Sequence, residues 1–307
     1  MELLKKLCTI RASSGDESAM TDFLLNYIKQ EQKTWNVKPK IYSGDGFQDA
    51  VVLVFGKPRT AVYAHIDSIG FTVGYNNHLI RIGSPRTTEG IKLVGQDQLG
   101  EIQTELLVIE HQDGDRYLQA VYKRNIERGT NLTFKPNFRE TKNFIQSPYL
   151  DNRLGVWVAL QLARTMKNGA IVFSTYEEHH GGSANYLARF LYEKHKVKQA
   201  LICDITWVTE GITHGKGVAI SMRDHGIPRR SYVNRIIDLA KKSKISFQLE
   251  VESAGGSDGT ILQASELPID WCFIGAPENN VHSPDEKVHK KDIASMLALY
   301  ELLMNKL

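Results

Sequence analysis

The stretch AIVFSTYEEHHGG, residues 170–182, combines the pattern of a buried strand with two adjacent acidic side chains. Its apolar residues IVF (171–173) are of the types that fill the central strands of sheets. In a continuing strand Glu177 and Glu178 would point to opposite faces, so we expect the chain to bend there, and the glycines at 181–182 allow a bend. The pattern is typical of a general base beside a metal ligand, but a polar strand end exposed to water is the commoner alternative. The rest of the sequence decides between the two.

Two apolar runs nearer the N-terminus place a histidine and an acid at a second strand end. Residues 51–55 and 61–64 predict neighbouring strands, separated by the turn GKP at 56–58. The second strand leads into His65 and Asp67, and because strand side chains alternate, these two residues lie on the same face. The sequence thereby places a carboxylate beside an imidazole.

The chain after residue 143 alternates between helical and strand patterns. We expect helices at 154–166, 186–194, 232–242 and 293–307, and strands at 200–203, 217–222, 246–251 and 269–274. Near the N-terminus, Ser14 and Glu17 have the spacing of a capping box that opens another helix. This alternation predicts an α/β domain.

Residues 76–143 show a different pattern, that of short strands in which apolar and polar residues alternate. These strands are expected at 78–82, 91–94, 102–111, 116–123 and 131–134, with a hairpin turn at QDGD (112–115). We therefore predict a small β-rich domain at 76–143. It interrupts an α/β domain formed by residues 1–75 and 144–307.

The composition is that of an ordinary globular protein. Of the 307 residues, 42% are apolar and 24% charged, and the net charge of +3 comes from short, scattered basic clusters that do not indicate a nucleic-acid groove. Three widely spaced cysteines without a C-x-x-C pair favour a reducing compartment. No signal-peptide core is visible, and no apolar run approaches the roughly 18 residues of a membrane span. We expect a cytoplasmic protein with neither nucleic acid nor membrane as a partner.

Several histidines and acids share the position where ligands bind in open α/β sheets, beyond the carboxyl ends of the strands. The residues at strand ends, or able to reach that rim, are His65, Asp151, Glu177, Glu178, Asp204 and His282. Two histidines and three acids can hold a pair of divalent ions, with one carboxylate bridging them and another acid free to accept a proton. Asp67 suits the role of orienting the His65 ring. Zinc or cobalt is favoured, while manganese and magnesium also accept such ligands.

The order of these residues resembles a known family. The segments that carry the resemblance are AHIDSIGF (64–71), LDNRLG (150–155), EE (177–178), CD (203–204), GKG (215–217), AGGSD (254–258) and VHSPDE (281–286). They are similar to those of the glutamyl aminopeptidase and endoglucanase-M family, the dinuclear metallo-aminopeptidases of the tetrahedral type, and the similarity covers nearly the whole chain.

The resemblance implies a fold, an activity and a role for each residue. It implies a mixed-sheet, phosphorylase/hydrolase-like α/β domain that removes N-terminal residues from short peptides with free N-termini. The implied roles are His65 and Asp204 as ligands of one metal, Glu178 and His282 as ligands of the other, Asp151 as the bridge and Glu177 as the general base. It also implies that the larger α/β domain is catalytic, that the β-rich domain serves oligomerisation or substrate access, and that the protein is a homo-oligomer, a dimer or higher.

Some residues depart from the family pattern, and other functions remain open. Ser68 stands where an acid is usual, Asn152 where a second Asp is common, and two histidines at 179–180 follow the acidic pair. The same centre could serve an amidohydrolase or deacylase acting on a small acylated amine, or persist in a catalytically inactive peptide-binding homologue. A nucleotide-binding function rests on the GKG at 215–217 alone, which lacks the pattern of a phosphate-binding loop.

Overall fold

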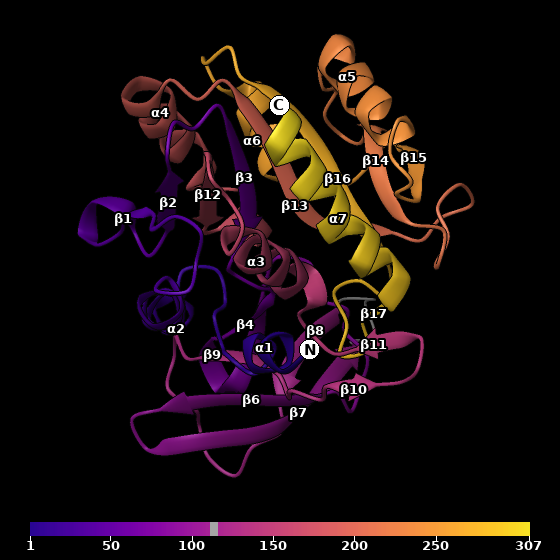
Figure 1. Cartoon of the computed structure of the whole chain (residues 1–307). Coiled ribbons are helices and arrows are strands. Elements are labelled where there is room, and N and C mark those ends of the chain that lie inside the picture. Colours follow the sequence, from indigo (N-terminus) through magenta and orange to yellow (C-terminus); the bar gives the residue numbers. More distant parts are fainter. Residues whose placement is uncertain (111–115) are drawn as a thin grey trace.

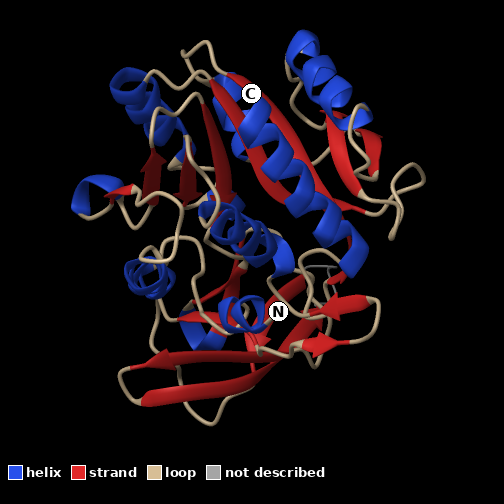
Figure 2. Cartoon of the chain, in the orientation of Figure 1, coloured by secondary structure: helices blue, strands red, loops and turns tan. Residues whose placement is uncertain are grey.

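The core of the fold is a mixed sheet whose central strands are buried along most of their length. The protein is described by a computed structural model that covers residues 1–110 and 116–307, so the predicted turn at 112–115 lies outside the described residues. Within this part of the chain the sheet has eleven strands, and helices cover both of its faces (Figures 1 and 2). A small closed barrel lies below the sheet in the view of Figure 1.

The strand order places the parallel strands at the centre of the sheet. The main path runs β1 (Lys40–Tyr42), β2 (Val51–Phe55), β12 (Gly169–Ser174), β3 (Thr60–His65), β13 (Gln199–Trp207), β16 (Asp270–Asn279), β17 (Lys287–His289), β11 (Phe144–Gln146) and β10 (Arg139–Glu140). A parallel pair, β14 (Val218–Arg223) and β15 (Phe247–Val251), joins at β16. Because β12, β3, β13 and β16 are mutually parallel, their carboxyl ends meet at one edge.

One predicted neighbour relation is wrong. The strands β2 and β3 are formed at the predicted residues, but β12 lies between them, antiparallel to β2 and parallel to β3. The short GKP turn therefore joins strands that are not paired with each other. Consecutive apolar runs predict two strands without predicting which strand each will pair with.

Alternate side chains of each central strand contribute to two different apolar layers. One layer contains Leu53 and Phe173 with helices α1 (Glu2–Leu7), α2 (Ser18–Glu31), α3 (Leu150–Ala163), α5 (Arg230–Lys241) and α7 (Lys290–Lys306). The other contains Val52 and Val172 with α4 (Ala184–His195) and α6 (Asp258–Ala264). Burial on both faces explains why these strands read as continuous apolar runs. The described chain has no helix with the length and apolarity that a membrane crossing requires.

The barrel forms the second body of the fold. Its strands are β4 (Gly70–Val73), β5 (His78–Ile82), β8 (Arg116–Ala120), β7 (Gly100–Glu110), β6 (Lys92–Asp97) and β9 (Asn131–Phe134), with a core of its own. The predicted fold class, a mixed α/β sheet with an inserted β-rich unit, is thereby confirmed. The first barrel strand, β4, begins before residue 76. Strand β10, inside 76–143, belongs to the large sheet, where it pairs with β11 directly after this range. We keep the division into two domains as a proposal.

Substitution of Gly155 tests the close contact between α3 and the sheet. A Cβ atom at this position would lie 2.0 Å from the carbonyl oxygen of Cys203 in β13 and 2.3 Å from Asn152 Oδ1. We expect Gly155→Ala to lower the free energy of unfolding by about 1–3 kcal/mol, because the helix must move away from the strand. Urea unfolding measures the difference. Gly46→Ala, where a Cβ would meet no atom within 4 Å, is the control, and equal midpoints for the two variants would contradict the close approach.

Candidate metal centre

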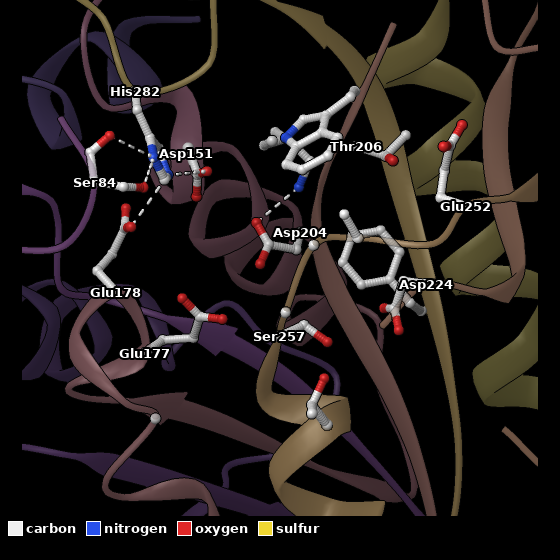
Figure 3. A pocket seen from close by; sticks show the side chains of 18 of the residues that line it. Ser84, Asp151, Glu177, Glu178, Asp204, Thr206, Asp224, Glu252, Ser257 and His282 are labelled. Atoms are coloured by element: carbon white, nitrogen blue, oxygen red, sulfur yellow. Dashed lines mark hydrogen bonds and ion pairs between the residues drawn. The ribbon is translucent and has the colours of Figure 1, made fainter. Parts of the chain in front are cut away.

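Most of the predicted residues lie together at the carboxyl edge of the central strands, namely Asp151, Glu177, Glu178, Asp204 and His282 (Figure 3). His65 lies against the carboxylates of Asp151, Glu177 and Asp204. His65 ends β3, Asp204 lies in β13, and the acidic pair forms a short 3-10 turn (Glu177–His179) after β12. Asp151 lies in the first turn of α3, and His282 follows β16. The expected bend at the acidic pair is confirmed, because Tyr176 immediately before it has a positive φ of 62°.

Asp151 lies between the two histidines. Its Oδ1 is 3.2 Å from His65 Nε2, and its Oδ2 is 3.4 Å from His282 Nε2. Asp204 Oδ2 lies 3.5 Å from His65 Nε2, and Glu178 Oε2 lies 3.1 Å from His282 Nε2. The donors thus fall into two sets, each with an imidazole nitrogen and a carboxylate, and both sets share Asp151.

This donor set fits divalent metal ions. Donor atoms of His65, Asp151 and Glu178 all lie within 4.8 Å of one another. Glu178 Oε1 is buried and has no hydrogen-bond partner, so part of its capacity as an acceptor is left for a ligand. Nitrogen and oxygen donors with several carboxylates suit hard or borderline divalent cations.

Asp67 supports the centre from beneath. It is fully buried, and its Oδ1 lies 3.4 Å from His65 Nδ1 on the side of the ring away from Asp151. Its two oxygens also accept the backbone N–H groups of Glu177 and Glu178, at 3.0 and 3.1 Å. Burial raises the pKa of Asp67, but His65 and the hydrogen bonds outweigh burial and leave the pKa below its usual value. Asp67 therefore stays ionised and fixes both the ring and the acidic turn.

The electrostatics distinguish Glu177 from the surrounding carboxylates. Burial raises its pKa well above the usual value; His65 opposes this shift, and Asp204 and Glu178 reinforce it. In contrast, burial alone would raise the pKa of Asp151, but the two histidines hold it far below its usual value. Glu177 Oε2 is 3.9 Å from His65 Nε2, the longest of the contacts around that ring. A carboxylate that is less engaged and has a raised pKa can exchange protons.

Three residues that contact the centre were not predicted from the sequence to belong to it. Ser14 donates a hydrogen bond of 2.6 Å to Asp67 Oδ2, and α2 begins at Ser18 without a side-chain cap, so the predicted capping box is wrong. Glu286 accepts the N–H groups of Asp151 and His282 at 3.2 and 3.1 Å. Ser84, in the segment after β5, has its Oγ 2.8 Å from His282 Nδ1. Glu286 lies inside the VHSPDE segment, which is the one signal the sequence offered.

The departures from the family pattern are accommodated as structural contacts. Asn152 donates to the carbonyl oxygen of Cys203 at 2.9 Å and accepts from Gly155 N–H at 2.8 Å, so it ties α3 to β13. Ser68 donates to the carbonyl oxygen of Ala12. His179 Nδ1 accepts the N–H of Gly83 at 3.2 Å.

Comparison with known proteins identifies the family of the chain. The model of the M42 glutamyl aminopeptidase family matches residues 96–299. "Putative aminopeptidase FrvX" of Escherichia coli is 24% identical, over 97% of this chain and 93% of its own. Aminopeptidase APDkam598 of Desulfurococcus kamchatkensis has a TM-score of 0.86 at 21% identity, over 100% of this chain and 94% of its own. The TET1 peptidase of Pyrococcus horikoshii has a TM-score of 0.82 at 20% identity, over 100% and 99%. The two structures show a shared fold, and the family match covers most of the chain, which therefore belongs to the M42 glutamyl aminopeptidase family.

Proposed function

We propose that the protein is a metal-dependent aminopeptidase that removes N-terminal residues from short peptides. The observation that carries the proposal is the pair of imidazole and carboxylate sets sharing Asp151, with Glu177 beside them. His65 and Asp204 would hold one divalent ion, and Glu178 and His282 would hold the other. Zinc and cobalt suit this donor set best, and manganese and magnesium are further candidates. Membership of the M42 family supports the same reading.

Bound divalent ions would polarise the scissile carbonyl and lower the pKa of a water molecule. The protein's own part in the reaction is proton transfer and positioning. Glu177 accepts a proton from the attacking water on a carboxylate oxygen and returns it to the leaving amine as the peptide bond breaks. Asp67 keeps the His65 ring in one orientation, and Glu286 and Ser84 fix His282. The adjoining cavity, of about 530 Å³, has room for the first residue of a peptide.

We also propose a homo-oligomer, a dimer or higher, located in the cytoplasm. The P. horikoshii TET1 peptidase is described as assembling into a tetrahedron or a large octahedral shell. The small barrel is the candidate for oligomerisation or for control of substrate access. All three cysteines are free and buried, in keeping with a reducing compartment.

Peptides with free and acetylated N-termini test the activity. We expect metal-stripped protein resupplied with zinc, cobalt or manganese to release amino acids from free N-termini only, measured by chromatography of a mixed peptide pool. Protein left without metal is the control. Release from acetylated peptides alone would favour the amidohydrolase alternative, and intact metal content without any release would favour an inactive peptide-binding homologue.

Glu177→Gln tests the proposed base. The substitution keeps the shape of the side chain but removes its ability to accept a proton, so we expect kcat to fall by about 10²- to 10⁴-fold. Metal content, measured by mass spectrometry, should stay near that of the unmodified protein. Full activity in this variant would show that Glu177 is not the base.

Asp151→Ala tests the proposed bridge. Because both donor sets share this carboxylate, we expect its loss to weaken binding of the divalent metal by at least about tenfold, measured by competition with a coloured chelator. Asp22→Ala, on the exposed face of α2, is the matched control. Unchanged metal affinity in Asp151→Ala would rule out a bridging role.

A further inference from the structure

The cavity continues beyond the candidate metal centre. In Figure 3, Thr206, Asp224 and Glu252 lie on one side of Asp204, while Glu178 and His282 lie on the other. This second half of the cavity is built by the end of β13, by the segments that follow β14 and β15, and by β16. A substrate whose reacting bond lies at the metal centre therefore has an adjoining space for a side chain.

Three carboxylates of this half are not used by the candidate metal centre. Asp224, Glu250 and Glu252 all line the cavity, and none of its described lining residues is a lysine or an arginine. Two divalent ions would bring four positive charges, which balance the four carboxylates of Asp151, Glu177, Glu178 and Asp204. The other three lining carboxylates would keep an uncompensated negative charge in the cavity.

Two of these acids are buried, although His225 and Arg223 beside Asp224 partly offset the effect of burial on its pKa. Asp224 is 7% exposed and Glu250 is 3% exposed, and neither forms an ion pair with a lysine or arginine in the described part of the chain. Their hydrogen bonds come from neutral groups: Gly226 N–H donates to Asp224 Oδ1, and Thr206 Oγ1 donates to Glu250. Burial raises the pKa of both carboxyls. A positive group in the cavity would relieve this cost.

The walls of the same space are aromatic. Phe273 lines it from β16 and is buried, and Trp207 lines it from the end of β13 with 42% of its surface exposed. Aromatic walls leading to carboxylates complement a side chain with an apolar stem and a cationic head.

We infer that this half of the cavity binds the side chain of the substrate's first residue and selects lysine or arginine. The inference rests on the proposed aminopeptidase function and names its substrate class. The stem of the side chain lies between Trp207 and Phe273, and its cationic head pairs with Glu252, Asp224 and Glu250. A glutamyl side chain, in contrast, meets like charges and is rejected.

The test compares 4-nitroanilides of lysine, norleucine and glutamate with the metal-loaded protein. The side chains of lysine and norleucine both contain four carbon atoms, and only lysine carries a terminal ammonium group. The ratio of their kcat/KM values therefore measures the contribution of the positive charge. A charge-assisted hydrogen bond predicts a ratio of about tenfold to a hundredfold in favour of lysine. The glutamyl compound should be the poorest of the three.

Variants then assign the preference to residues. Glu252→Gln changes a partly exposed side chain and should not endanger folding, and we expect it to lower the lysine-to-norleucine ratio by about tenfold. Asp224→Asn, of the same shape as the native residue, should lower the ratio as well. Glu193→Gln, on the exposed face of α4, is the matched control and should leave the ratio unchanged.

Hydrolysis of the norleucyl or glutamyl compound as fast as the lysyl one would overturn the inferred selectivity while leaving the aminopeptidase function intact. A lysine preference that survives both Glu252→Gln and Asp224→Asn would overturn the assignment to these residues. No hydrolysis of any compound, or of any peptide with a free N-terminus, would overturn the proposed function and the inference together.

Discussion

The burial of several carboxylates in one small volume is the constraint on which the rest of the structure depends. Asp151, Glu177, Glu178 and Asp204 lie at one edge of the sheet, largely shielded from water. Such a group is stable only where hydrogen bonds and positive charge offset the loss of hydration. His65 and His282 supply part of that positive charge, with Asp151 between them. Bound divalent cations would supply the rest.

The scaffold meets this constraint by fixing backbone groups instead of relying on long side chains. Asp67 binds two consecutive N–H groups of the acidic turn, and Glu286 binds the N–H groups of Asp151 and His282. Because these buried carboxylates accept backbone N–H groups, they fix the orientation of the neighbouring site residues before any ligand binds. The barrel contributes through Ser84, which contacts His282 Nδ1. A segment of the barrel unit therefore contacts a residue of the candidate metal centre directly.

The sequence predicted the elements of this structure better than their pairing. Buried strands are recognisable because both faces are apolar, and the acids at their ends stand out against that background. The position of β12 between β2 and β3 depends on contacts far apart in the chain, which local patterns do not contain. The same limit explains Ser14, whose spacing from Glu17 suggested a helix cap while its hydroxyl binds Asp67. Asp67 could be assigned its supporting role because it lies two residues after His65 in the same strand pattern, whereas Ser14 is far from the centre in the sequence.

The cavity shows why family membership determines a reaction centre more firmly than a substrate. The ligand arrangement depends on strand ends that the fold brings together, so it follows from the architecture. The far half of the cavity is lined instead by Asp224, Glu250 and Glu252, which take no part in the ligand arrangement. The chain as a whole has a net charge of +3, yet this cavity is lined by seven acids and no lysine or arginine among its described residues. The local field inside the cavity is therefore negative although the chain carries a net positive charge, because buried charges at short range outweigh the screened charges of the surface.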